Sequence, residues 1–569
     1  MRSSITAIAF ACSLFLLSCE QKQAKTTADA TASQSQYKNG MVVCAYPDAA
    51  QAGLSILKKG GNAIDAAVAV QFALTVTFPE AGNIGGGGFM VYRGANGETA
   101  TLDFREKAPG TATTNMFLDA KGNVVPNMSL VTHKASGVPG SVDGMITSHQ
   151  KYGKLSWAEV VQPAIDLAAK GFKITKNFAA DLNGAQADFK KENPGKTYFL
   201  KNTPWKAGDT IIQADLAKTL TIIRDKGRDG FYSGVVAGEI VAEMKKGNGL
   251  ISKADLSNYH SVWRTPIIGM YKGYKIITMP PPSSGGIALL QLLRSVEKYP
   301  LHRWGHNQDS TVQLMVEAER RVYADRSKYL GDPDFYKVPV QSLLNPAYID
   351  SRMKNFSWDA ATPSTAIQPG KMPGYEDTQT THFSIVDQYG NAVSITTTLN
   401  DWFGSKIAVG GAGFLLNNEM DDFSEKPGTP NMFGLVGGKA NSIQPNKRML
   451  SSMTPTILEK DGKLYMVVGS PGGSTIITTV FQTILNVTEF DQTMQQAVAA
   501  KRFHSQWLPD SVFFEAGALD TNTRQLLQQK GYRFAPSPPI GLVDAIQITK
   551  DGYLDGGADP RGDDTMAGW

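Results

Sequence analysis

Cysteine is scarce in this chain, with only Cys12, Cys19 and Cys44 among 569 residues. Cys12 and Cys19 belong to the N-terminal segment discussed below, so Cys44 has no disulfide partner in the rest of the chain. Stability must therefore come from a large apolar core, for which a hydrophobic content of 42% is ample. One thiol cannot build a metal cluster, and the seven histidines show no HExxH spacing. We expect neither a metal nor another cofactor.

Charge is also sparse: Lys, Arg, Asp and Glu make up 19% of the chain, and the net charge is only +4. The basic residues form no block of the kind that binds nucleic acid, so we expect no nucleic-acid partner. The glycine run 85–88 lacks the Gly-Lys-Ser/Thr ending of a P-loop, which argues against a nucleotide. Such a run instead lets two backbones approach closely, or presents amide groups to a ligand.

The N-terminal apolar run, residues 5–17, is too short to span a bilayer comfortably. Arg2 precedes it and Cys19 follows it, which resembles a bacterial lipoprotein signal in which residues 1–18 are removed and lipid is attached to Cys19. The polar tract 19–37 would then be a flexible tether. We expect an exported bacterial protein, held on the periplasmic side through lipidated Cys19. A plain secretory signal with an incidental Cys19 is the alternative.

Thr380 stands where a polar loop runs into a predicted strand, which a Gly390-Asn391 turn connects to a second strand over 393–399. Threonine is common in strands for packing reasons alone. The chemical alternative is a nucleophile whose preceding peptide bond is cut. The new α-amine, with an ordinary pKa of about 7.7–8.0, could then act as the base. The preceding segment 355–377 is polar and carries three prolines, which is typical of an exposed loop where a chain is cleaved.

Hydrophobic patterning predicts further elements around this hairpin. Asp48 is expected to cap a helix through Lys58, and Asn62 to begin a second helix that is apolar nearly all round and therefore buried. A strand over 464–468 opens into the glycine-rich turn 469–474 and then a helix. Amide groups in such a turn form an anion site, for a phosphate or for the oxyanion of an acyl transfer.

Charged residues stand at two further positions of interest. Arg105 follows an apolar strand, where it is either a solvated edge residue or a clamp for a carboxylate. Glu419, Asp421 and Asp422 form a short acidic loop. This loop could bind Ca²⁺, although its spacing does not fit an EF-hand, or it could receive an ammonium group. The Gly/Pro-rich segment 426–447 that follows is expected to be a mobile cover.

With these residues assembled, the chain resembles the γ-glutamyltranspeptidases from about Lys38 to Trp569. The resemblance rests on unbroken motifs in one order: Gly85-Gly86-Gly87-Gly88-Phe89-Met90, Asp103-Phe104-Arg105-Glu106, Pro280 to Gly286, Thr380-Thr381-His382, Leu416-Asn417-Asn418, Pro445-Asn446-Lys447-Arg448, Leu450-Ser451-Ser452-Met453 and Gly469 to Ser474.

The resemblance implies an α/β fold of the N-terminal nucleophile hydrolase type, a four-layer αββα sandwich. It also implies self-cleavage between Gln379 and Thr380. The products would be a large subunit over 38–379 and a small catalytic subunit over 380–569, which remain together as a heterodimer.

The same resemblance implies the catalytic roles. Thr380 would attack the δ-carbonyl of glutathione or another γ-glutamyl amide, forming a γ-glutamyl ester. The amides of Gly472 and Gly473 would hold the oxyanion, and Thr398 would position the nucleophile. Water would resolve the ester to glutamate, whereas an amino acid or peptide amine would form a new γ-glutamyl compound.

The substrate roles follow in the same way. The resemblance assigns the α-carboxylate to Arg105, Ser451 and Ser452. It assigns the α-ammonium group to Asn400, Glu419 and Asp422, and two acids beside one ammonium group also make electrostatic sense.

Two positions depart from well-known members of the family. Glu419 stands where some members carry Gln, so ammonium binding should survive. Phe433 stands where well-known bacterial members carry a Tyr that gates the pocket; it lacks the hydroxyl, and we expect a lid that opens more readily.

Two other functions compete with a γ-glutamyl enzyme. One is an acylase of the same fold acting on β-lactam side chains, against which the set of Arg105, Ser451 and Ser452 argues, because glutaryl groups lack the paired α-ammonium and α-carboxylate. The other is an exported lipoprotein that binds amino acids without chemistry. It would need neither Thr380 nor the glycine amides, and it would remain one chain.

Overall fold

The structure, a computed structural model, describes residues 36–195, 197–367 and 380–569. Residues 36–569 form one compact unit. The predicted signal at 1–18, the lipid site Cys19, nearly all of the tether 19–37 and the cleavage-site residue Gln379 lie outside the described residues.

Two seven-stranded antiparallel sheets form the centre of the described chain. The first, called the β10 sheet, has the order β19 (Thr565–Gly568), β2 (Met41–Cys44), β10 (Thr381–Val386), β11 (Ala392–Thr398), β3 (Gly87–Arg93), β4 (Thr99–Phe104) and β7 (Val262–Arg264). The second, called the β13 sheet, has the order β1 (Gln36–Tyr37), β18 (Leu554–Ala558), β17 (Asp544–Ile548), β13 (Lys463–Gly469), β12 (Thr456–Lys460), β9 (Tyr274–Thr278) and β8 (Ile267–Tyr271). Two small sheets contain β14 (Phe503–His504), β15 (Val512–Phe514) and β16 (Phe534–Pro536), and β5 (Phe172–Lys173) and β6 (Thr210–Ile211).

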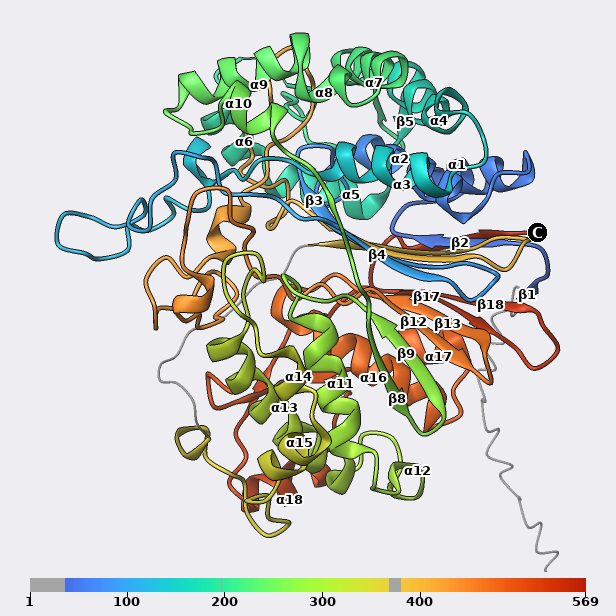
Figure 1. The fold of residues 1–569 in the computed structure, drawn as a ribbon, viewed down its shortest axis with the longest axis vertical. Coiled ribbons are helices and arrows are strands. Elements are labelled where there is room, and N and C mark those ends of the chain that lie inside the picture. The colour runs from blue at the N-terminus through green and yellow to red at the C-terminus, as the bar shows by residue number, and fades with distance from the viewer. Residues whose placement is uncertain (1–35, 196, 368–379) are drawn as a thin grey trace, which may run out of the picture. The chain divides into compact units, whose positions relative to one another are not determined.

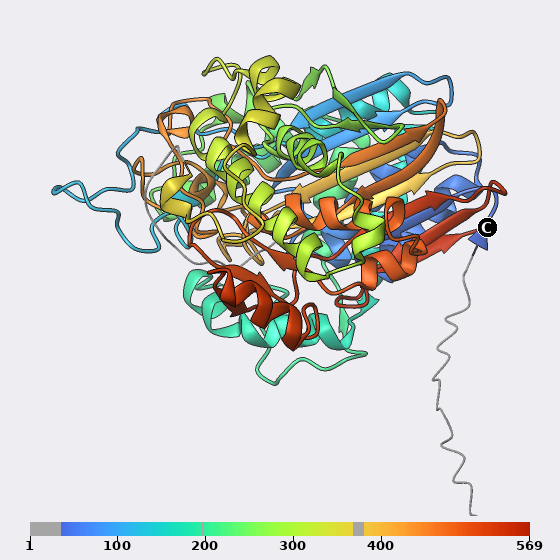
Figure 2. The ribbon, with the colours of Figure 1, turned by 90° about the horizontal axis from the view of Figure 1, so that it is seen from below.

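Polar side chains link the two central sheets. Ser384 of β10 donates a 2.9 Å hydrogen bond to the carbonyl of Asp544 on β17, and Ser394 of β11 donates a 3.1 Å bond to the carbonyl of Val468 on β13. In both views the yellow strands of the first sheet lie next to the orange strands of the second (Figure 1 and Figure 2).

Helices cover the outer sides of these sheets. Figure 1 shows α1–α10 on the side of the β10 sheet and α11–α18 on the side of the β13 sheet. The first group is α1 (Pro47–Lys58), α2 (Ala63–Thr77), α3 (Ser141–Tyr152), α4 (Trp157–Lys170), α5 (Lys176–Gly184), α6 (Gln186–Glu192), α7 (Ala214–Lys226), α8 (Asp229–Tyr232), α9 (Gly234–Lys246) and α10 (Lys253–Ser257). The second group is α11 (Gly285–Val296), α12 (Leu301–Trp304), α13 (Asp309–Tyr329), α14 (Val340–Leu343), α15 (Pro346–Arg352), α16 (Ile476–Thr488), α17 (Met494–Ala499) and α18 (Thr521–Gln529).

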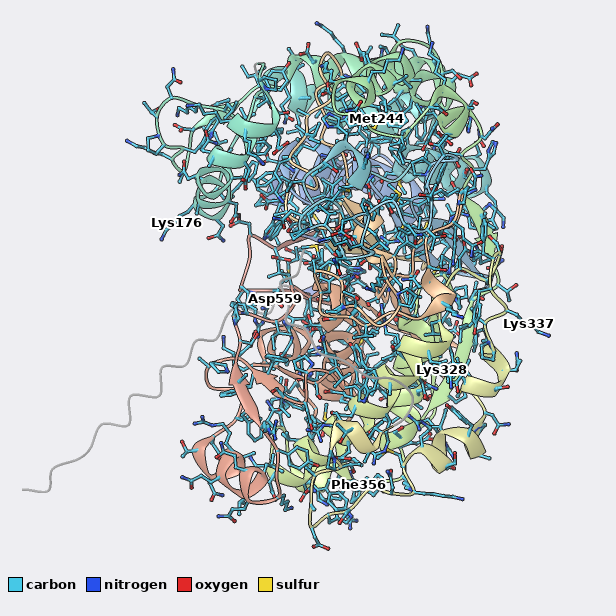
Figure 3. The ribbon with its side chains drawn as sticks, turned by 90° about the vertical axis from the view of Figure 1, so that its left-hand side faces the viewer. Lys176, Met244, Lys328, Lys337, Phe356 and Asp559 are labelled. Atoms are coloured by element: carbon cyan, nitrogen blue, oxygen red, sulfur yellow. The ribbon has the colours of Figure 1, made fainter. Side chains whose placement is uncertain are left out.

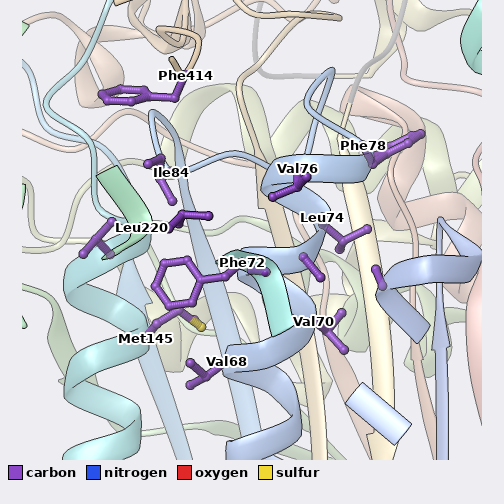
Figure 4. Packing of buried hydrophobic residues seen from close by; sticks show 14 of the residues in the cluster. Val68, Val70, Phe72, Leu74, Val76, Phe78, Ile84, Met145, Leu220 and Phe414 are labelled. Atoms are coloured by element: carbon purple, nitrogen blue, oxygen red, sulfur yellow. The ribbon is translucent and has the colours of Figure 1, made fainter. Parts of the chain in front are cut away.

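Helix α2 is buried along its whole length, as its apolar sequence predicts. Asn62 caps it by accepting hydrogen bonds from the amides of Ile64 and Asp65, and Asp65 returns a bond to the Asn62 amide. Figure 4 shows Phe72 of α2 in one hydrophobic cluster with Met145 of α3. This helix therefore anchors the outer helices to the β10 sheet.

The predicted cap of α1 was wrong by two residues. The helix begins at Pro47, and its N-cap is Tyr46, whose side chain makes no capping bond. Proline suits the first helical position because its missing N–H would be unpaired there. Asp48 instead lies in the first turn, where a negative charge favours the helix N-terminus.

Charged side chains such as Lys176 and Lys337 extend from the surface, whereas Met244 lies inside (Figure 3). Arg105 is an exception, because its side chain is fully buried. A buried charge is costly unless it is paired, so the partners of Arg105 indicate where a site has been built.

Candidate active site

The hairpin of β10 and β11 places Thr380 and Thr398 at the same end of the β10 sheet. Thr381 pairs with Thr397, so Thr380 immediately before β10 lies beside Thr398 at the end of β11. Thr398 Oγ1 accepts a 2.7 Å hydrogen bond from the amide of Asn400. Both threonines are buried, and both line one cavity.

The glycine run 85–88 permits this arrangement. A Cβ atom on Gly86 would lie 1.9 Å from the carbonyl oxygen of Thr398, and one on Gly85 would lie 1.9 Å from that of Leu415. Only glycine fits at such distances. The predicted close approach of two backbones is confirmed, and one of those backbones belongs to Thr398.

The cavity brings together nine of the ten predicted site residues. The nine are Thr380, Thr398, Gly473, Arg105, Asn400, Glu419, Asp422, Ser451 and Ser452. Phe433, Leu435, Met453 and Ile476 complete the lining, and Gly472 stands next to it in sequence without being part of it.

Arg105 lies in this wall between two acids. Its Nη1 pairs with Glu419, its Nη2 pairs with Asp422, and Glu106 Oε2 lies 3.5 Å from Nη1. Burial alone would lower the pKa of Arg105, but Glu419, Asp422 and Glu106 raise it above its ordinary value. Arg105 is therefore a permanent buried cation, and the solvated-edge alternative is wrong.

The three carboxylates of the acidic loop face different partners. Asp421 accepts hydrogen bonds from Ser129 Oγ at 2.8 Å and from the Met432 amide at 3.0 Å, whereas Glu419 and Asp422 face Arg105. In the described ranges no three His, Cys, Asp or Glu side chains are placed to hold a metal ion. Asp421 is thus bound within the protein, whereas Glu419 and Asp422 pair with the cation of the cavity wall.

A proline-containing turn holds the two serines. The Ser451 amide donates to the carbonyl of Pro282 at 3.0 Å, and the Ser284 amide donates to the carbonyl of Ser451 at 2.7 Å. The motif at 280–286 thus forms a brace for the pair Ser451 and Ser452, whose side chains line the cavity beside Arg105.

The glycine-rich turn after β13 leads into α16, as predicted. Gly472 has φ 135° and Gly473 has φ 49°, conformations that side chains rarely adopt. A Cβ atom on Gly473 would lie 2.7 Å from the ring of Phe433, so this ring covers the turn directly. Phe433 is buried and belongs to the cavity wall, which fits the predicted cover; its mobility remains a prediction.

The apolar lining residues Leu435, Met453 and Ile476 were missed by sequence reasoning. Met453 and Ile476 lie within three residues of the predicted site residues Ser452 and Gly473, and Leu435 lies two residues after Phe433. An apolar side chain, however, gives no chemical signal of its own. Apolar side chains at these positions exclude water, and the lower effective dielectric constant strengthens electrostatic interactions in the cavity.

Comparison with known proteins shows to which family the chain is similar. The family model described as gamma-glutamyltranspeptidase matches residues 49–569. The glutathione hydrolase proenzyme of Escherichia coli strain K12 is 50% identical over 535 residues, covering 94% of this chain and 92% of that protein.

Two solved structures are also similar. The Helicobacter pylori gamma-glutamyltranspeptidase is 48% identical with a TM-score of 0.56, covering 57% of this chain and 94% of the matched one. The cephalosporin acylase from Bacillus halodurans is 29% identical with a TM-score of 0.83, covering 94% of this chain and 96% of that one. The extent of the family match and the identity to the Escherichia coli protein show that this chain belongs to the γ-glutamyltranspeptidase family.

Proposed function

We propose that this enzyme is a γ-glutamyltransferase and glutathione hydrolase whose nucleophile is Thr380. The observation that carries the proposal is one cavity in which Thr380 lies together with Arg105, Glu419, Asp422 and the two serines. A hydroxyl nucleophile and a charged set suited to an α-amino acid group are what a γ-glutamyl amide requires.

Thr380 becomes active when the chain is cleaved before it. The fold is the four-layer αββα sandwich of N-terminal nucleophile hydrolases, and cleavage gives a large subunit over 38–379 and a small subunit over 380–569. The burial of Thr380 and Thr398 at adjacent ends of one hairpin supports a role of Thr398 in positioning the nucleophile. The two subunits share a continuous sheet, in which β10 and β11 lie between β2 and β3, and this supports a stable heterodimer.

The reaction begins when the α-amine of Thr380 accepts the proton of its own hydroxyl. The oxygen bonds to the δ-carbonyl carbon of the γ-glutamyl group, and the carbonyl oxygen takes the negative charge. The amides of Gly472 and Gly473 stabilise this oxyanion. The C–N bond then breaks, the amine leaves with the proton, and a γ-glutamyl ester remains on Thr380. Water releases glutamate from this ester, and an amino acid or peptide amine forms a new γ-glutamyl amide.

Recognition depends on the far end of the γ-glutamyl group. Arg105, Ser451 and Ser452 bind the α-carboxylate, while Asn400, Glu419 and Asp422 bind the α-ammonium group. When the substrate binds, its carboxylate pairs with Arg105 and its ammonium group pairs with Glu419 and Asp422, so both replace the ion pairs that Arg105 makes within the protein. Because these contacts are remote from the scissile bond, they orient the substrate and leave the departing amine free to vary.

The chain is exported and anchored by lipid on Cys19. Within 36–195, 197–367 and 380–569, the helices are too short or too polar to cross a membrane.

An acylase acting on β-lactam side chains is the second candidate, favoured by the similarity to the Bacillus halodurans cephalosporin acylase. The charges of the cavity weigh against it. A glutaryl side chain presents one carboxylate and no ammonium group, so Glu419 and Asp422 would have no ligand charge to balance.

The test is the intact mass of the purified protein under denaturing conditions, beside Thr380→Ala. We expect two pieces from the native protein, one of which begins at Thr380, and one whole chain from the variant. Thr381→Ala is the matched control, because Thr381 is also a buried threonine but is the residue after the expected cleavage site. An uncut native chain would overturn the proposal and favour an amino-acid-binding lipoprotein. Cleavage without release of p-nitroaniline from γ-glutamyl-p-nitroanilide would exclude the γ-glutamyl substrate.

A further inference from the structure

Arg326, near the end of α13, does not line the cavity but contacts residues of its wall. Its side chain is buried, its Nε donates a 2.9 Å hydrogen bond to Ser284 Oγ, and its Nη2 donates a 2.9 Å bond to Ser452 Oγ. Ser284 Oγ in turn donates to the carbonyl of Ser451 at 2.6 Å. One guanidinium therefore holds both serines of the cavity wall, Ser452 directly and Ser451 through Ser284.

The direction of these hydrogen bonds is fixed by chemistry. A guanidinium has donors and no acceptor, so Ser452 Oγ must accept from Arg326. Ser451 Oγ likewise accepts from the amide of Met453 at 3.1 Å, and a backbone amide can only donate. In both serines the oxygen is engaged as an acceptor, which leaves the hydroxyl proton available to donate.

Neither of these protons has an acceptor in the part of the chain that the structure describes. Among the described residues, neither the hydroxyl of Ser451 nor that of Ser452 donates to a protein acceptor. Ser284 differs, because it accepts from Arg326 and passes its own proton to the Ser451 carbonyl. Two hydroxyl donors thus line the cavity beside the donor-only guanidinium of Arg105.

We propose that Arg326 is a positioning residue that keeps the Ser452 hydroxyl turned into the cavity as a donor, so that the site selects γ-acyl donors with a free α-carboxylate. An α-carboxylate accepts hydrogen bonds from both serines, whereas an α-carboxamide brings an NH₂ group that needs acceptors. The inference rests on the proposed γ-glutamyl chemistry, and it adds a residue outside the cavity lining as the origin of the selectivity.

The charge of Arg326 supports the same arrangement. Burial raises the pKa of Asp422, and Arg105 and Arg326 oppose this effect by attraction. Arg326 therefore also helps to keep Asp422 ionised for the substrate ammonium group. A merely structural role would leave the preference between carboxylate and carboxamide unchanged.

The experiment compares two substrates, γ-glutamyl-p-nitroanilide with a free α-carboxylate and its α-carboxamide counterpart. In Arg326→Gln we expect KM for the carboxylate substrate to rise about tenfold or more, the range expected for losing a hydrogen bond to a charged group. We expect kcat to change less than KM, and the preference for the carboxylate over the carboxamide to fall by a similar factor. Arg326→Lys keeps the charge and one donor. Its KM and its preference for the carboxylate should lie between those of Arg326→Gln and those of the native enzyme.

A double-mutant cycle separates orientation from charge. If Arg326 acts through the Ser452 hydroxyl, Ser452→Ala should lower the preference, and adding Arg326→Gln should lower it little further. Arg320→Gln is the matched control, because Arg320 is a buried arginine of the same helix that contacts the carbonyl of Thr362 and Asp510 and does not line the cavity. Its preference should stay at the native value.

Additive effects in the cycle, or an unchanged preference in both Arg326 variants, would overturn the inference. If Arg326→Gln does not yield folded protein, Arg326→Lys and the cycle built on it decide the question. A native enzyme that releases no p-nitroaniline from the carboxylate substrate would instead contradict the proposed function, so the two failures are distinguishable.

Discussion

Arg105 and Glu419 form a buried ion pair in the wall of the cavity that contains Thr380. The cation assigned to the substrate carboxylate is thus paired with an acid assigned to the substrate ammonium group. A γ-glutamyl ligand would replace the pairs of Arg105 with Glu419 and Asp422 by pairs with its own carboxylate and ammonium group, so each buried charge would keep an opposite charge beside it. A ligand with only one of the two charges would leave Arg105 or Glu419 without a partner, which is costly in a buried site.

The first prediction concerns the guanidinium of Arg105. Arg105→Lys keeps a positive charge but loses the planar fork that pairs with two oxygens at once. We expect KM for γ-glutamyl-p-nitroanilide to rise about 10–100-fold, corresponding to about 1.5–3 kcal/mol for hydrogen bonds to a charged group. Arg93→Lys is the control, since Arg93 is a buried arginine paired with Glu459 and lies outside the cavity. Equal KM values in both variants would contradict the assignment.

The second prediction concerns the pH dependence of substrate binding. Burial raises the pKa of Glu106 to about 7, and Arg105 opposes the shift. Below this pKa Glu106 is neutral, and above it a carboxylate lies 3.5 Å from the guanidinium proposed to hold the substrate carboxylate. We therefore expect KM of the native enzyme to rise between pH 6 and pH 8. Glu106→Gln, which stays neutral, should show a flatter KM profile over this range; parallel profiles would refute the role of Glu106.

The third prediction concerns the proposed oxyanion site at Gly472 and Gly473. In Gly473→Ala the new methyl group meets the ring of Phe433 at 2.7 Å, so the turn or the ring must move. Displacing one oxyanion donor should lower kcat by about 10²–10³-fold with little change in KM. Combining Gly473→Ala with Phe433→Ala removes the collision, and kcat should then recover toward that of Phe433→Ala alone. No recovery would mean that the strained φ of 49°, and not the ring, limits the variant.

Local features of the site were predictable from the sequence. The Gly390-Asn391 turn predicted the hairpin, whose second strand lies one residue from its expected position, and the glycine run predicted the close backbone approach at Thr398. The capping box at Asn62 was equally visible. In each case the signal is a residue type that few other local structures would require.

Long-range contacts were not predictable in this way. Arg105 follows a strand, but the partners of its guanidinium come from more than 300 residues later: the carboxylates of Glu419 and Asp422 and the carbonyls of Met449 and Leu450. Arg326 carries no signal in the sequence, because its partners Ser284 and Ser452 come from two other segments. A sequence pattern describes what a residue needs but not which distant segment supplies it.

The last prediction concerns His382, which lies between the two sheets two residues after Thr380. Ser384 donates its proton to the Asp544 carbonyl, so His382 Nε2 must donate to Ser384 Oγ at 3.1 Å. Nδ1 then accepts from Thr396 Oγ1 at 2.9 Å. The neutral imidazole satisfies every partner, and burial lowers the pKa of His382 to about 3.

This depressed pKa links stability to pH. Between the unfolded value of about 6.5 and the folded value of about 3, the unfolded chain binds a proton that the native chain does not. The free energy of unfolding contributed by His382 is therefore fully present above about pH 6.5 and falls by about 1.4 kcal/mol per pH unit on acidification. His382→Gln should lower stability at pH 7 but flatten its decline between pH 6.5 and pH 4.

The measurement is denaturant unfolding at several pH values in a Thr380→Ala background, which keeps the protein as one chain if cleavage needs Thr380. His504→Gln provides a comparison, because burial lowers the pKa of His504 to about 4 and its effect has the same sign over a shorter window. Slopes that remain parallel in the native, His382→Gln and His504→Gln forms would show that neither imidazole is held neutral. Below pH 4 the slope of unfolding free energy against pH should be flatter in His382→Gln than in the native form, whereas the slope of His504→Gln should match the native one. This result would show that the pKa of His382 is lowered more than that of His504.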